Sequence, residues 1–432
     1  MADLLQAYCN GRHLGEITLD GANDRYGLGY SAGWITGNGF PVSPHLPLDS
    51  CSPEPVRRFL ANLLPEGKWL EELAQLTHIS RFNTFGLIAA IGMETTGALT
   101  FRLGDVSVEP PPTSFRPVST DELTLRIGNR RERSIALWDG KPRLSVAGVQ
   151  DKLPVLIMPD GSLGFGEGDL ASTHILKFGT AADIHLVVNE FICMELARRI
   201  KLPVAEAELS RMGEPFLMVK RFDRQWQDAR TVNRLHLIDG CQMLDLPPTY
   251  KYERPFGKGG DAAVIRSGAT LPALFAASRF CRIPAAAMRD MLHWTLYQLV
   301  IGNSDAHAKN ISFFVTPGGI DVAPAYDLLC LDMYGERYDR DLSMAVGDTF
   351  NPDEIMPWQL AEMCEACKLS QRQVAKSLAT LCQNLLREIE VSDLSEKLVA
   401  DEKSFAADLI ARIANNCRKY LAFAQELPGI RL

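Results

Sequence analysis

The segment that decides the predicted fold is IGNSDAHAKNISFF, residues 301–314. It follows an apolar stretch at helical spacing that starts at Pro284, and it runs into an apolar strand. Asp305 and Asn310 stand five residues apart in the connecting loop. In protein kinases such a loop supplies an Asp that accepts the proton of the substrate hydroxyl and an Asn that holds magnesium. The spacing indicates a kinase-like catalytic loop, although by itself it also fits a loop whose Asp and Asn only bond the backbone.

A second carboxylate follows in VAPAYDLLC, residues 322–330, where Asp327 stands seventeen residues after Asn310. The turn Pro317-Gly318-Gly319 lies between them and predicts a hairpin. Kinases carry their second metal-binding Asp after such a hairpin, and carboxylate and amide oxygens both suit Mg²⁺. Asn310 and Asp327 are therefore the predicted magnesium ligands. The alternative is that Asp327 caps the next helix.

Two upstream segments supply candidates for binding phosphate. THILKF, residues 173–178, places Lys177 on a predicted strand, and Glu190 follows on a predicted helix over 186–200. Kinases pair such a Lys and Glu to orient the phosphates, whereas the alternative is a surface Lys on an edge strand. RLSVAGVQDKLPV, residues 143–155, fits neither standard phosphate-loop pattern, but its small residues leave backbone N–H groups accessible to a phosphate.

The order of these segments predicts an α+β fold of the bilobal protein-kinase type, with an N-terminal α+β subdomain and an all-α C-terminal lobe. The predicted domains are residues 1–112, 113–245 and 246–432, and Pro110-Pro111-Pro112 marks the first boundary. Expected elements include a hairpin at Asn10-Gly11, a helix capped by Thr120 and three or four helices within 357–425. Two more helices are expected over 54–64 and 66–92.

The composition is that of a globular protein. The chain has 432 residues, 46% of them hydrophobic, and a formal net charge of -8, which argues against a protein that coats nucleic acid non-specifically. Ten scattered cysteines predict buried thiols, and the close pair Cys364 and Cys367 lacks the second pair that a zinc site needs. The N-terminus lacks signal-peptide features, and no apolar run is long enough for a membrane helix, so a cytoplasmic location without membrane association is expected.

The chain resembles the HipA family in five motifs, which are SVAGVQDKLP (145–154), THILKF (173–178), VKRFDR (219–224), IGNSDAHAKN (301–310) and PAYD (324–327). The N-terminal part is similar to the family's N-terminal subdomain in AYCNGRHLGEI (7–17), FLANLLPEG (59–67) and FGLIAAIGMETTGALTF (85–101). The resemblance covers nearly the whole chain. It implies a serine/threonine kinase that uses ATP and Mg²⁺ and serves as the toxin of a bacterial toxin–antitoxin module.

The resemblance also implies roles for individual residues. Asp305 matches the catalytic Asp, Asn310 and Asp327 match the metal ligands, and Ser145 matches the serine that is autophosphorylated. The implied ATP contacts are Ala147, Gly148, Val149, Gln150, Asp151, Lys152, Lys177, Lys220, Arg221, Phe222, His307, Ala308, Lys309, Asn310, Tyr326 and Asp327.

The implied partners are a HipB-like helix-turn-helix antitoxin and a protein substrate, most often glutamyl-tRNA synthetase among the aminoacyl-tRNA synthetases. The chain departs from the family pattern at Lys220, where the hinge often has Glu, and it has no Lys or Arg within residues 341–367. Operator DNA is therefore expected to be bound mainly through the antitoxin. Two alternatives stay open, a kinase-like enzyme acting on a small molecule and an ATP-binding pseudokinase that acts as a corepressor.

Overall fold

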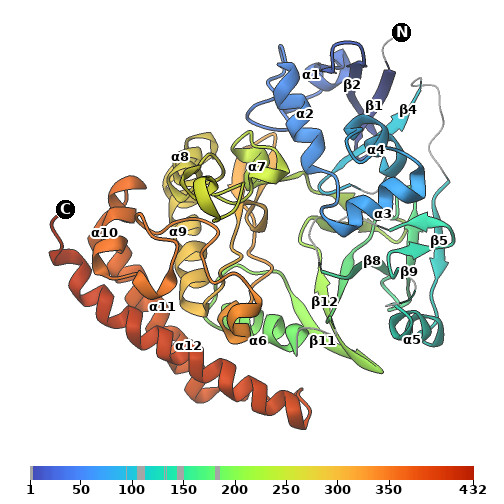
Figure 1. Cartoon of the computed structure of the whole chain (residues 1–432). Helices are drawn as coiled ribbons and strands as arrows, with labels where there is room; N and C mark the ends of the chain where they lie inside the picture. The colour runs from blue at the N-terminus through green and yellow to red at the C-terminus, as the bar shows by residue number, and fades with distance from the viewer. Residues whose placement is uncertain are drawn as a thin grey trace. The chain divides into compact units, whose positions relative to one another are not determined.

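The computed structural model describes residues 3–93, 95–104, 112–130, 132, 134–143, 150–180 and 185–432. Helices and sheets are mixed along the chain, which confirms the α+β fold class (Figure 1). The chain divides into two compact units. The first comprises Met1–Thr180, Ser210–Ile238 and Phe313–Ile320, and the second comprises Ala181–Leu209, Asp239–Ser312 and Asp321–Leu432.

The first unit begins with a four-stranded sheet of order β3-β2-β1-β4. Its strands are β1 (Asp3–Cys9), β2 (Arg12–Asp20), β3 (Arg25–Tyr30) and β4 (Leu99–Leu103). Asn10 and Gly11 have φ of 48° and 74°, so the predicted two-residue hairpin turn is confirmed. The sheet is accompanied by the helices α1 (Ala32–Thr36), α2 (Pro53–Asn62), α3 (Lys68–Thr77) and α4 (Thr84–Ile91).

The prediction of one helix over residues 66–92 was wrong. The chain forms α3 and α4 instead, because His78 adopts a left-handed conformation with φ of 55° and ends α3. Asn83 then starts α4, and its side chain accepts a hydrogen bond from the Gly86 amide. The helix α5 (Thr120–Gly128) was also assigned the wrong cap, since the side chain of Ser119, and not of Thr120, accepts from the Glu122 amide.

A six-stranded sheet of order β11-β12-β10-β8-β9-β5 completes most of the first unit. Its strands are β5 (Ser114–Pro117), β8 (Lys152–Ile157), β9 (Leu163–Glu167), β10 (His174–Phe178), β11 (Ala207–Met212) and β12 (Glu214–Lys220). Two short hairpins are formed by β6 (Leu137–Trp138) with β7 (Lys141–Pro142), and by β13 (Arg224–Asp228) with β14 (Thr231–Arg234). A further sheet has the order β15-β16-β17, with β15 (Leu237–Asp239), β16 (Ser312–Thr316) and β17 (Gly319–Val322).

The second unit is mostly helical. Its α-helices are α6 (Leu186–Arg199), α7 (Gly240–Met243), α8 (Leu271–Ala276), α9 (Pro284–Ile301), α10 (Pro357–Ala366), α11 (Gln371–Val391) and α12 (Ala400–Glu426). The 3-10 helices in the described residues are η1 (Pro248–Tyr250), η2 (Gly260–Val264), η3 (Ala277–Phe280), η4 (Ala308–Asn310), η5 (Leu331–Arg337), η6 (Pro352–Glu354) and η7 (Leu427–Gly429). The helices predicted to start at Pro284 and to lie within 357–425 are confirmed, and α11 and α12 pack side by side (Figure 1).

The core of the second unit fixes the end of α9. The C-terminal half of α9 is almost wholly buried, and the Tyr297 hydroxyl donates to the Cys193 carbonyl of α6 at 2.5 Å. Fully buried Asn189, also on α6, accepts from the Cys330 amide at 2.8 Å and donates to the Cys330 carbonyl at 2.9 Å. These bonds hold α9 and the segment after Asp327 against the same helix.

Nine of the ten cysteines are buried, and all ten carry free thiols, as predicted. Within the described residues, no helix combines the length and the apolar character needed to cross a membrane. Pro110 and Pro111 lie outside the described residues, and the division into domains at residues 112 and 245 stays a prediction.

Candidate active site

The candidate catalytic loop begins where α9 ends at Gly302. Gly302 has φ of +75°, its amide donates to the Leu299 carbonyl at 3.2 Å, and the Asn303 amide donates to the Gln298 carbonyl at 3.0 Å. These two bonds end the helix at a residue in the left-handed conformation, which glycine adopts more readily than other residues. A Cβ at position 302 would lie 3.2 Å from the Asp332 Cβ, so the turn packs closely against the segment that follows Asp327.

Asn303 joins the two predicted functional segments, although it is not among the predicted site residues. Its Oδ1 accepts from the Asp305 amide at 3.1 Å, and its Nδ2 donates to Gln298 Oε1 at 2.8 Å and to the Asp327 carbonyl at 3.3 Å. The side chain is only 2% exposed. An Asn two residues before Asp305 is the pattern of an Asx turn, which is the signal that marks this position in the sequence.

Asp305 is half-buried and is held on both its side chain and its backbone. The Tyr252 hydroxyl donates to Asp305 Oδ1 at 2.7 Å, and the Asn310 Nδ2 donates to the Asp305 carbonyl at 2.9 Å. The second bond fixes the plane of the Asn310 amide, whose oxygen is the predicted metal ligand. Asp305 and Asn310 are thus brought together within one loop, although each makes the backbone contacts that the alternative reading also expected.

Asp327 is also half-buried and has an unusual backbone conformation for a residue other than glycine, with φ of +58°. Its carbonyl accepts from Asn303, and the hydroxyl of the preceding Tyr326 donates to the Lys309 carbonyl at 2.7 Å. The next helical segment begins at Leu331 with Cys330 as its N-cap, so the alternative in which Asp327 caps that helix is wrong. The metal-ligand role stays a prediction.

Residues 307–309, which precede Asn310, are buried. Lys309 is 7% exposed, and its ammonium forms an ion pair at 2.5 Å with Asp239, the N-cap of α7. The ring of His307 packs edge-on against Tyr252 with centroids 5.1 Å apart, and the Ala308 amide donates to the Lys251 carbonyl at 3.1 Å. The Lys309 charge is therefore engaged within the second unit.

The donor set of this loop fits magnesium. Asn310 and Asp327 offer an amide oxygen and a carboxylate, and Asn303 ties together the segments that carry them. Mg²⁺ commonly binds one or two such side chains together with water and substrate phosphates. The described residues contain no group of three or more His, Cys, Asp or Glu side chains arranged to hold a metal.

The phosphate-binding candidates lie in the first unit. Lys177 lies on β10, which is flanked by β8 and β12, so the alternative of an edge-strand Lys is wrong. It stands directly opposite Lys152 of β8 in an antiparallel pair, which puts both side chains on the same face of the sheet.

The described end of the predicted phosphate loop is bonded to the same strand. Gln150 Nε2 donates to the Phe178 carbonyl at 3.1 Å, and the Phe178 amide donates to the Asp151 carbonyl at 2.9 Å. The loop therefore joins the sheet beside Lys177. Ser145, Ala147, Gly148 and Val149 lie outside the described residues.

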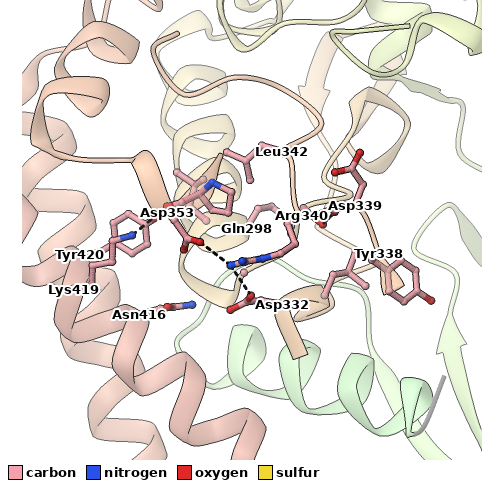
Figure 2. A pocket seen from close by; sticks show the side chains of 15 residues that line it. Gln298, Asp332, Tyr338, Asp339, Arg340, Leu342, Asp353, Asn416, Lys419 and Tyr420 are labelled. Atoms are coloured by element: carbon pink, nitrogen blue, oxygen red, sulfur yellow. Dashed lines mark hydrogen bonds and ion pairs between the residues drawn. The ribbon is translucent and has the colours of Figure 1, made fainter. Parts of the chain in front are cut away.

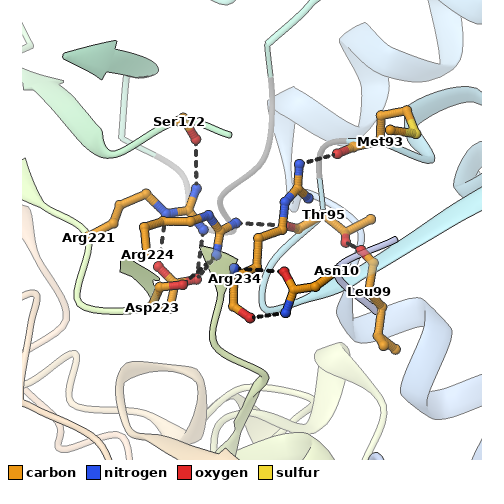
Figure 3. A network of polar contacts seen from close by, with 9 residues as sticks. All are labelled: Asn10, Met93, Thr95, Leu99, Ser172, Arg221, Asp223, Arg224 and Arg234. Atoms are coloured by element: carbon orange, nitrogen blue, oxygen red, sulfur yellow. Dashed lines mark hydrogen bonds and ion pairs between the residues drawn. The ribbon is translucent and has the colours of Figure 1, made fainter. Parts of the chain in front are cut away.

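The predicted hinge starts at Lys220, the exposed last residue of β12, and leads into a buried ionic network (Figure 3). The Arg221 guanidinium donates twice to Asp223, at 3.0 and 2.8 Å, and Arg224 donates to the same carboxylate at 2.6 Å. Burial alone would raise the pKa of Asp223, but the charges of Arg221 and Arg224 outweigh it and hold the pKa well below its usual range.

The network engages the side chain of Arg221, one of the residues predicted to contact the adenine. Arg221 is 5% exposed and also donates to Ser172 Oγ at 3.1 Å, so its side chain is engaged and any nucleotide contact at this position falls to its backbone. Phe222 is half-buried and packs edge-on against Phe314 with centroids 5.8 Å apart. Glu190 lies fully buried on α6 in the second unit, whereas Lys177 belongs to the first, and their pairing stays a prediction.

A small cavity in the second unit is lined in part by the start of the candidate catalytic loop, and Figure 2 shows most of its other lining side chains. Gly302 and Ser304 line it, and Arg340 there bonds Asp332 at 3.5 Å and Asp353 at 3.0 Å. Its volume of about 60 Å³ is far below the roughly 300–1,000 Å³ of ligand pockets. We therefore interpret these ion pairs as contacts that stabilise the loop. A cavity of about 640 Å³ is lined by residues 200–203, which follow α6, and by residues of α9 and α11, and none of the predicted site residues lines it.

Comparisons with known proteins identify the family. Residues 5–102 match the HipA N-terminal domain, and residues 144–389 match the HipA-like C-terminal domain. The chain is 40% identical over 423 residues to the serine/threonine-protein kinase toxin HipA of Shewanella oneidensis, covering 97% of this chain and 96% of the relative. It is 33% identical over 354 residues to the putative kinase Y4mE of Sinorhizobium fredii, covering 80% and 81%.

A solved structure matches nearly the whole chain. It is the complex of HipA, HipB and operator DNA from Shewanella oneidensis MR-1, and it aligns with a TM-score of 0.89 and 38% identity over 99% of this chain and 100% of the matched chain. Sequence and fold together define a toxin–antitoxin kinase. The chain belongs to the HipA family, and it is a serine/threonine protein kinase toxin of the HipA type.

Proposed function

We propose that this kinase transfers the γ-phosphate of ATP to a serine or threonine of a protein that serves translation. The observation that carries the proposal is the loop of residues 301–310, in which Asn303 links the backbone of Asp305 to that of Asp327. Phosphoryl transfer depends almost wholly on positioning and on neutralising charge, and the bonded frame of this loop with Asp327 would supply a base and two hard oxygen ligands.

Each residue has a defined part in the reaction. The Asp305 carboxylate accepts the proton of the acceptor hydroxyl while its oxygen attacks the γ-phosphorus, and ADP leaves with the bridging oxygen. Asn310 and Asp327 would hold Mg²⁺, which neutralises charge on the phosphates when bound. Lys152 and Lys177 bind the phosphates as point charges, and the backbone at Lys220 to Phe222 holds the adenine. The paired lysines on one face of the sheet support this assignment.

The acceptor and the partners are proposed from the family. The acceptor is an aminoacyl-tRNA synthetase, with glutamyl-tRNA synthetase as the first candidate. A HipB-like antitoxin neutralises the kinase in the cytoplasm and carries most of the contact to operator DNA, since a chain of net charge -8 attracts phosphate weakly. The β-rich lobe over residues 113–245 and the helical lobe over residues 246–432 would be the lobes of a bilobal kinase. Phosphorylation of Ser145 would place a second charged group beside the ATP phosphates and so limit activity.

The test is phosphate transfer from labelled ATP. Purified protein with Mg²⁺ should label glutamyl-tRNA synthetase on a serine or threonine, and mass spectrometry of the products should find phosphate on Ser145. Labelling of a small-molecule alcohol but of no protein would favour a small-molecule kinase. ATP binding without any transfer would instead favour a pseudokinase corepressor.

Lys177→Met should slow transfer without unfolding the protein. Its ammonium is a point charge that methionine of similar length does not replace, so we expect the loss of about 2–3 kcal/mol of transition-state stabilisation, or roughly 30- to 160-fold in kcat/KM. Exposed Lys141 on β7 offers a matched control, and Lys141→Met should keep full activity. Equal activity of Lys177→Met and the native chain would remove Lys177 from the phosphate site.

A further inference from the structure

Tyr252 contacts the proposed catalytic base from a distant part of the chain. It lies after η1 in the second unit, 53 residues before Asp305, and its hydroxyl donates to Asp305 Oδ1 at 2.7 Å. None of the family motifs in the sequence includes it. The contact therefore adds a residue that the motifs do not predict to the frame around Asp305.

The backbone on both sides of Tyr252 is fixed. The Lys251 carbonyl accepts from the Ala308 amide of the catalytic loop at 3.1 Å, and the Glu253 amide donates to the Ser343 carbonyl at 2.9 Å. A Cβ at Gly268 would lie 1.8 Å from the Tyr252 carbonyl oxygen, which shows how closely the backbone at Gly268 packs against Tyr252. The ring also packs edge-on against His307. Tyr252 therefore keeps its place independently of its bond to Asp305.

Glu253 anchors the same segment more deeply. Its side chain is 2% exposed, accepts from Arg266 Nε at 2.6 Å and accepts from the Ala345 amide at 2.7 Å. Ser343, two residues before Ala345, donates through its amide and its hydroxyl to the Ser304 carbonyl, each at 2.9 Å. Residues 251–253, 304–308 and 343–345 thus form one bonded assembly with the Tyr252 hydroxyl aimed at Asp305.

We propose that Tyr252 is a positioning residue for phosphoryl transfer, an inference that rests on the proposed role of Asp305 as the base. A carboxylate that accepts a hydrogen bond on Oδ1 from a fixed hydroxyl is restrained in rotation, and its second oxygen is then the one presented to the acceptor hydroxyl. Such a bond to an ionised group is among the stronger hydrogen bonds in proteins. Tyr252 itself exchanges no proton with the substrate.

Tyr252→Phe tests the proposal because it removes only the hydroxyl. With labelled ATP and glutamyl-tRNA synthetase as the acceptor, we expect kcat to fall roughly 10- to 100-fold, as for the loss of one hydrogen bond to a charged group. The KM for ATP and the melting temperature should stay the same. Tyr250→Phe is the matched control and should keep native kcat, since the Tyr250 ring packs on Phe256 and, in the described part of the chain, its hydroxyl has no hydrogen bond to Asp305.

A double variant separates positioning from general support of the fold. Under single-turnover conditions with enzyme in excess, adding Tyr252→Phe to Asp305→Asn should cause no further loss, because the bond acts only through the Asp305 carboxylate. If the fold-losses of the two single variants instead multiply in the double variant, Tyr252 has a structural role and the proposal is wrong. Native kcat in Tyr252→Phe would also overturn it. If Asp305→Asn itself keeps native turnover, the proposed function fails instead.

Discussion

Asp305→Asn should reduce phosphate transfer by on the order of 10³-fold while nucleotide binding persists. The Asn side chain keeps the shape and the contact with Tyr252 but no longer accepts the proton of the acceptor hydroxyl, and general-base catalysis contributes about 10²–10⁴-fold. Binding persists because the predicted metal ligands are Asn310 and Asp327. Transfer of labelled phosphate and calorimetric titration with Mg-ATP measure the two effects.

Two comparison variants complete this experiment. Asp261→Asn makes the same chemical change at an exposed position of η2 and should leave both measurements unchanged. Asp327→Asn should lose transfer and also weaken Mg-ATP binding, since the carboxylate is proposed to hold the metal. Native turnover in Asp305→Asn would refute the assignment of the catalytic base.

Asp223→Asn should produce a large loss of stability. The Asp223 carboxylate compensates the buried guanidinium groups of Arg221 and Arg224, and removal of one partner of such a buried set costs about 3–5 kcal/mol. Arg224 also donates to the Thr95 carbonyl at 3.4 Å, so the effect should extend to the segment before β4 (Figure 3). Thermal and urea unfolding measure it, and exposed Asp121→Asn on α5 is the control.

The same carboxylate predicts the sign of a pH effect. Its pKa is lower in the folded chain than the ordinary value of 3.8, so its contribution to stability is full well above pH 3.8 and is lost as the pH falls toward the folded pKa. The native chain should therefore lose stability relative to Asp223→Asn on acidification. Curves that stay parallel from pH 6 to pH 3 would contradict the ionic role of Asp223.

The sequence predicted the elements whose causes are local. Pro284 starts α9, Asn10-Gly11 turns the first hairpin, and the Asp305 to Asn310 spacing falls in a loop between a helix and a strand, as expected. The errors had local causes as well, since His78 in a left-handed conformation divides the expected helix over 66–92.

Residues that act across long separations were not predicted. Asn303, Tyr252 and Asp239 gain their roles from partners up to 70 residues away, and no periodicity marks such pairs. Asp223 stands inside a recognised motif, but its burial between two arginines is visible only when the strands are assembled.

The bonds of Asn303 have a consequence for the design of inhibitors. An inhibitor whose binding moves the Asp327 backbone away from Asp305 would break the hydrogen bond from the buried Asn303 side chain to the Asp327 carbonyl. Leaving such a group unsatisfied costs about 1–3 kcal/mol, which would weaken the compound roughly 5- to 150-fold. Compounds that occupy the nucleotide position with Asp327 in place avoid this loss. We therefore expect ATP mimics to be better starting points than ligands that trap Asp327 in a displaced position.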